Sequence, residues 1–186
     1  MVLILSPVLF LVIGIISLLI WVEDRKNPFF IQMRTGAYGR RFPMFKFRTM
    51  VPNAEELKQE LIHLNELEYP DFKIQNDPRV TRLGRFLRRT SLDELPQFIN
   101  VLLGDMSLVG PRPTSFEAKT YEPWQRARLV VVPGITGLWQ VNGRSDVGFD
   151  ERVQLDIKYI EQQSFLFDLL ILWRTFSCVL KGRGAY

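Results

Sequence analysis

Residues 77–113 read DPRVTRLGRFLRRTSLDELPQFINVLLGDMSLVGPRP. This stretch combines a run of arginines, the adjacent carboxylates Asp93 and Glu94, an apolar segment and a Gly-Pro-Arg-Pro turn that ends at Pro113. A hydrophobic core does not require that combination, whereas binding a phosphorylated anion does. We therefore expect the fold and the functional site to be organised around this stretch.

Two short helices are predicted within it. Thr81 can cap the first, in which Leu83, Phe86 and Leu87 recur at the spacing of one helix face. Gly104 is a natural end for the second. The apolar stripe that we expect the second helix to bury consists of Leu95, Phe98, Ile99 and Leu102.

The second helix has two alternative starts. Ser91 and Glu94 have the spacing of a capping box, but this start places Pro96 inside the helix, where proline loses a hydrogen bond and clashes with the preceding turn. A start at Asp93 puts Pro96 in the first turn, where its missing N–H does no harm, and we prefer it. Asp93 and Glu94 then lie at a helix N-terminus, a place that phosphates and divalent cations can share. The alternative is that Asp93 is only a cap and the arginines form a solvated face.

The composition restricts the chemistry. The chain has 186 residues and a net charge of +4, which suits anionic partners. Cys178 is the only cysteine, so an internal disulfide is excluded. His63 is the only histidine, so a metal site built from several histidines is excluded, and we do not expect a Ser-His-Asp triad within the chain. Carboxylates must therefore carry any acid–base or nucleophilic work.

The N-terminal residues 2–22 form an uncharged apolar run. As a helix this run would be about 31 Å long, close to the ~30 Å of a bilayer core. Ser6-Pro7 should kink or break the helix near its start. The basic residues that follow favour a cytoplasmic location for the rest of the chain.

A hairpin is predicted next, with Gly36 and Gly39 in its turn. Alternation along residues 42–50 places Lys46 and Arg48 on one face, where together they could cradle a diphosphate. The alternative is a half-exposed edge strand that these two cations protect from aggregation.

Elsewhere the pattern predicts helices and short strands. Asn53 and Glu56 have capping-box spacing for a helix over 53–68, and Val153, Ile157 and Ile160 define one face of a helix over 149–163. A helix over 165–180 is too short and too charged to span a membrane and is either buried or interfacial. The remaining predictions are a short helix over 121–128 and strands over 130–132 and 138–141.

Five motifs together resemble the bacterial sugar transferase family, the monotopic phosphoglycosyl transferases. They are KFRTM (46–50), DPRVTRLGRFLRRTS (77–91), TSLDELPQFINVLLGDMSLVGPRP (90–113), PGITGLWQVNGR (133–144) and GRGAY (182–186). The resemblance implies an enzyme that transfers a sugar-1-phosphate from a UDP-sugar to polyprenyl (undecaprenyl) phosphate and releases UMP. It places the enzyme at the cytoplasmic face of the bacterial inner membrane, where it would catalyse the first membrane step of exopolysaccharide or other glycoconjugate biosynthesis.

The resemblance also implies roles for particular residues. Asp93 would be the nucleophile that forms an aspartyl phospho-sugar intermediate, and Glu94 would be essential, as a metal ligand or an acid–base group. Mg²⁺ bound through Asp93, Glu94 and the phosphates would offset the repulsion between these anions. The predicted substrate- and phosphate-binding residues are Lys46, Arg48, Arg88, Arg112 and Arg144, although a plain turn explains Arg144 equally well.

The expected architecture is a helix-rich α+β fold. Residues 1–22 form a membrane-inserted anchor helix, and residues 23–186 form one cytoplasmic catalytic domain with a small antiparallel β element. Related enzymes have a re-entrant anchor with a Ser-Pro bend, but only five residues precede Ser6 here, so either the first arm is missing or the anchor is a simple helix. Membrane lipid is an expected partner, and a homo-oligomer is compatible with the sequence.

Two other functions are alternatives. One is a membrane-tethered nucleic-acid-binding module, in which Phe86 and the tryptophans would stack on bases. Asp93 and Glu94 place negative charge beside the basic face and argue against it, so no nucleic-acid partner is expected. The other is an inactive scaffold in a polysaccharide assembly, which the intact Asp93, Glu94 and Arg112 oppose.

Overall fold

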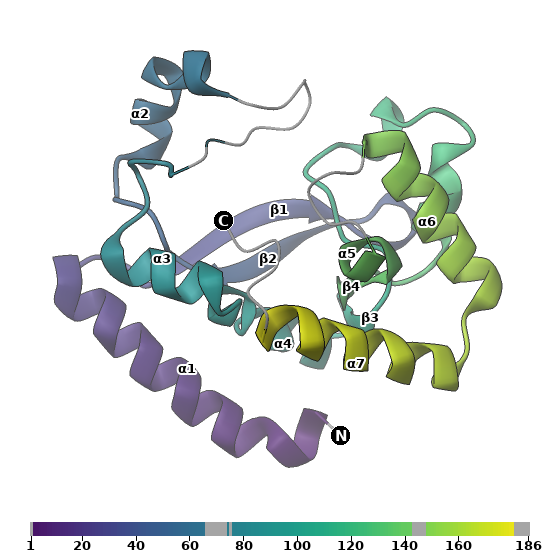
Figure 1. The fold of residues 1–186 in the computed structure, drawn as a ribbon, viewed down its shortest axis with the longest axis horizontal. Coiled ribbons are helices and arrows are strands. Elements are labelled where there is room, and N and C mark those ends of the chain that lie inside the picture. Colours follow the sequence, from purple (N-terminus) through teal and green to yellow (C-terminus); the bar gives the residue numbers. More distant parts are fainter. Residues whose placement is uncertain (1, 66–73, 75, 143–147, 181–186) are drawn as a thin grey trace.

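The computed structural model of the chain describes residues 2–65, 74, 76–142 and 148–180. Its helices are α1 (Val2–Asp24), α2 (Ala54–Glu60), α3 (Arg82–Arg89), α4 (Gln97–Leu102), α5 (Leu138–Asn142), α6 (Phe149–Gln162) and α7 (Phe165–Leu180). Its strands are β1 (Phe29–Thr35), β2 (Arg41–Phe47), β3 (Ser107–Val109) and β4 (Gly134–Thr136). Short 3₁₀ helices are η1 (Ala37–Gly39), η2 (Ile62–Leu64), η3 (Leu92–Glu94), η4 (Ala118–Thr120) and η5 (Gln125–Val130). The fold is therefore helix-rich α+β, as predicted (Figure 1).

The apolar helix α1 packs under the rest of the molecule. Its residues Ile13, Ile16 and Ile20 are buried against Phe47 and Leu87, whereas its other faces expose large apolar side chains to the surroundings. Residues 6–24 have a mean hydropathy of 2.3, and only 17% of the stretch is buried, so α1 is long and apolar enough to cross a membrane. The helix continues through Pro7, and Figure 1 shows its axis changing direction near that end.

The predicted hairpin is confirmed. Strands β1 and β2 pair antiparallel, with Phe30 opposite Lys46 and Arg34 opposite Phe42. The turn between them has two residues with positive φ, Tyr38 and Gly39, and a glycine accommodates such a conformation without strain. One face of the hairpin carries Phe30, Gln32, Arg34 and Lys46 toward a common cavity.

The first helix of the stretch over 77–113 forms as predicted. Thr81 caps α3 by accepting a hydrogen bond from the Gly84 amide at 2.9 Å. Gly84 is required by packing, because a Cβ there would lie 2.1 Å from the carbonyl oxygen of Thr49. Leu87 is buried, but the expected apolar face is wrong at Phe86, which is 55% exposed.

The preferred start of the second helix is wrong. Ser91 has a φ of 56°, which ends α3, and the next residues form η3 before α4 begins at Gln97 behind Pro96. Asp93 and Glu94 therefore lie in a 3₁₀ turn ahead of the α-helix. The predicted end at Gly104 is correct, since this glycine has a φ of 80°.

The expected buried stripe of α4 is confirmed only in part. Leu95 packs against the core, but the fully buried side chains of the helix are polar. Gln97 and Asn100 are fully buried, whereas Leu102 is 37% exposed. The Asn100 side chain accepts a hydrogen bond from the Phe45 amide at 3.1 Å and donates to the Pro43 carbonyl at 2.7 Å. These bonds fasten α4 to β2, so the polar face of α4 points inward.

The segment around Pro133 differs from the prediction. Residues 138–141 lie in α5, not in a strand, and residues 130–132 form no strand. The strand in this region is β4, which pairs in parallel with β3. Gly134 permits this pairing, because a Cβ there would lie 2.1 Å from the Gly110 amide nitrogen.

The remaining helices agree with the prediction in part. Helix α6 buries Val153 as expected, and Ile160 packs against the core while partly buried. Asp156 and Tyr159 are buried as well, which was not predicted. Helix α2 starts without a side-chain cap from Asn53, and the predicted residues 66–68, like the GRGAY motif at 182–186, lie outside the described residues.

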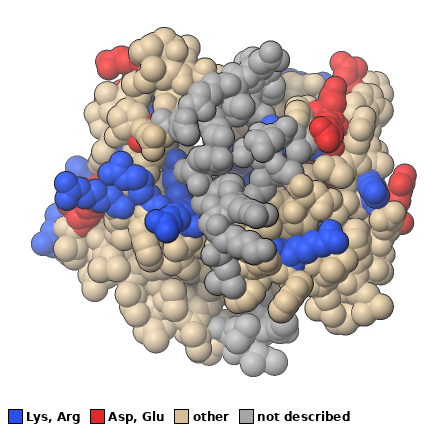
Figure 2. Space-filling view, in the orientation of Figure 1, with Lys and Arg blue, Asp and Glu red and all other residues tan. Residues whose placement is uncertain are grey.

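Helix α7 has one buried and one exposed apolar face. Ile171 is fully buried, whereas Leu166, Trp173 and Phe176 are more than half exposed. Helices α1 and α7 lie along the lower side of the molecule in Figure 1. Figure 2, in the same orientation, shows few charged side chains on this lower part and basic groups above it.

Candidate active site

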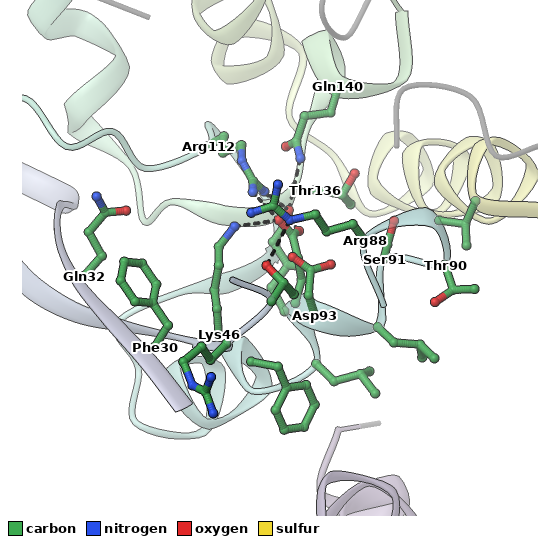
Figure 3. Close-up of a pocket in the computed structure, with 18 of the residues that line it drawn as sticks. Phe30, Gln32, Lys46, Arg88, Thr90, Ser91, Asp93, Arg112, Thr136 and Gln140 are labelled. Carbon is green, nitrogen blue, oxygen red and sulfur yellow. Dashed lines mark hydrogen bonds and ion pairs between the residues drawn. The ribbon is translucent and has the colours of Figure 1, made fainter. Parts of the chain in front are cut away.

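A cavity of about 980 Å³ opens between the hairpin, η3, the Gly-Pro-Arg-Pro turn, α5 and α7. Six of the predicted site residues line it: Lys46, Arg48, Arg88, Asp93, Glu94 and Arg112. The seventh, Arg144, lies outside the described residues. The fold thus brings residues from three separate segments of the chain to one cavity (Figure 3).

Glu94 is held by two cations. Its Oε1 lies 2.9 Å from the Lys46 Nζ and also contacts a terminal nitrogen of Arg112, whose other terminal nitrogen donates to Oε2 at 3.2 Å. Burial alone would raise the pKa of Glu94, but Arg112 and Lys46 outweigh it and hold this pKa well below its usual range. Glu94 is therefore ionised at neutral pH and joins the hairpin to the Gly-Pro-Arg-Pro turn.

Asp93 has different surroundings although it is adjacent in the chain. Burial raises the pKa of its carboxyl, and the negative charge of Glu94 adds to this effect. Lys46, Arg88 and Arg112 offset the rise only in part. In Figure 3, Lys46, Arg88 and Arg112 converge near Asp93. Two carboxylates with pKa values pushed in opposite directions are typical of a catalytic pair with divided roles.

Arg88 comes to the site from the last turn of α3. Its Nε donates a hydrogen bond to the Thr49 hydroxyl at 2.9 Å, and burial lowers its pKa. Thr49 is the same residue whose carbonyl oxygen lies against Gly84. The close packing of α3 on Thr49 therefore sets the position of Arg88.

Arg48 does not pair with Lys46 at the centre of the site. Its guanidinium forms an ion pair with Asp24 at the end of α1, at 2.7 Å from Oδ1, and its Nε donates to the Asn27 carbonyl at 2.7 Å. Lys46 and Arg48, which were predicted to bind a diphosphate together, therefore make separate contacts. Lys46 faces Glu94, and Arg48 ties the hairpin to α1 at the edge of the cavity.

Both the side chain and the backbone carbonyl of Arg112 are held by hydrogen bonds. One terminal nitrogen donates to the Ile135 carbonyl at 3.2 Å, and its own carbonyl accepts a hydrogen bond from Arg128 at 2.8 Å. Arg128 in turn lies 2.6 Å from the Asp156 carboxylate, and both side chains are buried. This buried pair holds the turn that carries Arg112.

Several residues of the site were not predicted from the sequence. Arg34 and Gln32 line the cavity on the same hairpin face as Lys46, and period-two alternation in β1 together with the predicted turn could have placed them there. Arg128 and Asp156 come from η5 and α6 and are 28 positions apart. No local pattern indicates that pair.

The protein side chains do not form a complete metal site. Among the described residues, no group of three or more His, Cys, Asp or Glu side chains gathers closely enough to hold a metal ion. Both oxygens of Glu94 contact cations of the protein, which leaves the Asp93 carboxylate to contribute. A magnesium ion fits this hard oxygen donor if phosphate oxygens and water complete its coordination.

Comparison with known proteins gives a consistent set of relatives. Residues 1–182 match the family model described as bacterial sugar transferase. The galactosyl transferase CpsE of Streptococcus agalactiae serotype III is 46% identical over 180 residues, which are 94% of this chain and 40% of that protein. The undecaprenyl-phosphate galactose phosphotransferase of Salmonella typhimurium is 49% identical over 158 residues, which are 82% of this chain and 33% of that protein.

A third relative is closer in length. The exopolysaccharide production protein ExoY of Sinorhizobium fredii is 41% identical over 187 residues, which are 98% of this chain and 81% of that protein. The chain thus spans between a third and two fifths of the first two relatives and about four fifths of ExoY.

Proposed function

Because the chain belongs to the bacterial sugar transferase family, we propose that it transfers a sugar-1-phosphate from a UDP-sugar to undecaprenyl phosphate and releases UMP. This reaction would begin the assembly of an exopolysaccharide or a related glycoconjugate. The name of the Salmonella typhimurium relative makes UDP-galactose the first donor to test. The observation that carries the proposal is the Asp93–Glu94 pair, with opposite pKa shifts, among Lys46, Arg88 and Arg112.

The proposed reaction has two steps at one phosphorus atom. A carboxylate oxygen of Asp93 attacks the phosphorus that carries the sugar, the bond from this phosphorus to the bridging oxygen breaks, and UMP leaves with that oxygen. A phosphate oxygen of undecaprenyl phosphate then attacks the same phosphorus, and the Asp93 carboxylate is released. The lipid phosphate is already an anionic nucleophile and needs no strong base. The raised pKa of Asp93 suits this role, because a more basic carboxylate is a stronger nucleophile.

Glu94 keeps the cations of the site in place. Its ion pairs fix Lys46 and Arg112 beside Asp93, so their charges already face the position where the diphosphate would lie. Such fixed charge is what phosphoryl transfer chiefly requires from a protein. Asp93 and Glu94 remain the predicted magnesium ligands, with Asp93 the more available of the two. When bound, Mg²⁺ supplies further positive charge beside the diphosphate.

The proposal includes a membrane location. Helix α1 would anchor the chain, and the basic residues that follow it, among them Arg25 and Lys26, favour the cytoplasmic side for residues 23–186. The cavity is lined on one side by Leu172, Phe176 and Val179 of α7, so this side adjoins the apolar helix α7. A lipid-linked acceptor could enter from there and a water-soluble donor from the opposite side.

The test is to trap the intermediate. Protein in detergent or nanodiscs is incubated with Mg²⁺ and UDP-galactose labelled in the sugar, with no lipid acceptor. We expect label to become bound to the protein, UMP to reach about one equivalent, and added UMP to return the label to UDP-galactose. Asp93→Asn should retain no label, whereas Glu56→Gln, which removes an exposed carboxylate on α2, should behave like the wild type.

Two results would contradict the proposal. UMP that forms only when undecaprenyl phosphate is present, with no label on Asp93, would indicate direct displacement and reassign Asp93 as a metal ligand. A panel of UDP-sugars with no UMP release under any condition would reject the transferase activity itself.

A further inference from the structure

Arg34 is a cation of the cavity that the proposed reaction has not used. It lies in β1 on the same hairpin face as Phe30, Gln32 and Lys46, and it lines the cavity. The next residue, Thr35, donates its amide to the Thr114 carbonyl at 2.9 Å. This bond holds the end of β1 against the segment that directly follows the Gly-Pro-Arg-Pro turn, which places Arg34 near Arg112.

The guanidinium of Arg34 has few partners within the protein. One terminal nitrogen donates to the side-chain oxygen of Gln32, but its Nε is buried without a hydrogen-bond partner among the described residues. No carboxylate in the described ranges lies within ion-pair distance of Arg34, in contrast to Arg48, Arg79 and Arg128. Burial and the nearby charge of Arg112 lower the pKa of Arg34 to about 10. A desolvated cation with an unused donor is costly unless a ligand supplies an anion.

The charges around Glu94 are also unbalanced in favour of cations. Arg34, Lys46, Arg88 and Arg112 surround the two carboxylates Asp93 and Glu94. Glu94 is shared between Lys46 and Arg112, and Asp93 acts on Arg88. Four cations therefore face two carboxylates, and Arg34 and Arg88 form no ion pair within the described residues. These two arginines reach the site from different elements, β1 and α3. A ligand with two or more negative charges would balance them.

We propose that Arg34 binds a phosphate oxygen of the donor's diphosphate, with Gln32 orienting the guanidinium. This inference rests on the proposed function. It assigns Arg34 to the donor because β1 starts next to α1 and runs away from it: Arg34 is four residues beyond Phe30, about 13 Å along the strand. The lipid phosphate is tethered to the membrane side, whereas the soluble UDP-sugar can reach the far end of the hairpin.

The geometry of the side chain makes the proposal specific for arginine. A guanidinium can donate to Gln32 through one nitrogen and to a phosphate oxygen through another at the same time. A lysine has a single ammonium group without this planar fork. Arg34→Lys should therefore recover only part of the binding that Arg34→Gln loses.

The experiment measures UDP binding to the full chain in nanodiscs without lipid acceptor, by calorimetry. Arg34→Gln should raise the Kd for UDP at least tenfold. The Kd of Arg34→Lys should lie between the values for Arg34→Gln and the wild type. The matched control is Arg40→Gln, which removes the same charge from the turn of the same hairpin, where the side chain is 68% exposed and outside the cavity. Its Kd should equal that of the wild type. In turnover, Arg34→Gln should raise the KM for the UDP-sugar and leave the KM for undecaprenyl phosphate unchanged.

The outcomes separate this inference from the proposed function. If the wild type binds UDP and Arg34→Gln binds it equally well, with an unchanged donor KM, the inference is wrong and the transferase proposal stands. If only the KM for undecaprenyl phosphate rises, Arg34 belongs to the acceptor site and the assignment to the donor is overturned. If the wild type does not bind UDP, the assignment of Arg34 to a diphosphate site is overturned, whereas the transferase proposal is judged by UMP release from the UDP-sugar panel. A thermal melt of each variant shows whether it folds, and Arg34→Lys, which keeps the charge, provides the comparison should Arg34→Gln unfold.

Discussion

Asp93 and Glu94 are neighbours in the chain, yet the structure gives their carboxylates opposite environments. Glu94 contacts Lys46 and Arg112 directly, and these contacts overcome the cost of its burial. Asp93 is close enough to the same cations to feel their charge, but burial has the larger effect on its pKa. The site therefore stabilises one carboxylate in its ionised form and destabilises the other.

This difference predicts that Asp93→Asn makes the protein more stable at alkaline pH while abolishing turnover. The folded-state pKa of Asp93 is raised, so the wild type loses stability as pH rises from the ordinary aspartate value of about 3.9 through the folded value, and the Asn variant has no such loss. Thermal melts between pH 4 and pH 8 should show the variant melting above the wild type at pH 8, with the gap closing toward pH 4. A wild type that melts higher at pH 8 would show that burial does not dominate at Asp93.

Glu94→Gln provides the opposite control for these melts. The pKa of Glu94 is lowered in the folded state, so its contribution to stability is present above the ordinary glutamate value of about 4.3 and is lost as pH falls toward the folded value. Glu94→Gln should therefore melt below the wild type at pH 8. Its deficit should shrink in acid.

At the scale of secondary structure, α3 is positioned by the contact between Gly84 and Thr49. The Thr81 amide donates to the Thr49 carbonyl at 3.0 Å, the Arg88 guanidinium donates to the Thr49 hydroxyl, and Gly84 lets the helix approach the backbone between them. Thr49, which follows β2, thus fixes both ends of α3, the helix that carries Arg88.

Gly84→Ala should destabilise the protein and lower activity together. The added Cβ would lie 2.1 Å from the Thr49 carbonyl oxygen, so α3 must move, and overpacking of this kind typically costs about 1–3 kcal/mol. The movement displaces Arg88, so the KM for the donor should rise as well. The matched control is Gly148→Ala at the N-cap of α6, where no contact within 4 Å of the added methyl is found among the described residues and φ is −62°.

Denaturant unfolding and steady-state kinetics check this prediction. A Gly84→Ala protein with the stability of the Gly148→Ala control would mean that α3 can shift without cost. Normal stability combined with a raised KM for the donor would instead mean that the substitution displaces Arg88 without destabilising the fold.

At the scale of the whole molecule, the apolar surfaces of α1 and α7 share one side. Trp173 is 70% exposed and Leu166 is 76% exposed, while the opposite face of α7 is held to the domain by the buried Ile171 and by a 2.7 Å hydrogen bond between Thr175 and Thr136. Thr136 is in β4, next to the Ile135 carbonyl that holds Arg112. Contact of α7 with a membrane would therefore set the height of the active site above the lipid.

We predict that the exposed face of α7 lies in the membrane interface. A nitroxide attached to Trp173→Cys, in a Cys178→Ser background, should be more accessible to oxygen than to a water-soluble nickel complex in nanodiscs. The control label at Glu161→Cys, on the exposed surface of α6, should show the reverse. Equal accessibility of the Trp173 label to both reagents, with α1 still inserted, would place α7 in water.

Local sequence was sufficient for several parts of this protein. The Thr81 cap, the end of α4 at Gly104, the hairpin with Gly39 in its turn, and the length of α7 all depend on interactions between residues that are close in the chain. The residues of the site were also named from the sequence, because the adjacent carboxylates lie among arginines and because the motifs resemble a known family. Six of the predicted site residues line one cavity.

Tertiary contacts decided what local sequence could not. Asn100 turns the polar face of α4 inward because its amide satisfies the backbone of β2, and the apolar spacing of the helix cannot reveal that partner. Residues 138–141 have the composition of a strand, but β3 pairs with residues 134–136 and leaves the later residues to form α5. Arg128 supports Arg112 only because Asp156, 28 positions later, is folded against it. Buried polar groups must be satisfied by whatever partner the fold places beside them, and that choice of partner follows from the packing of distant segments.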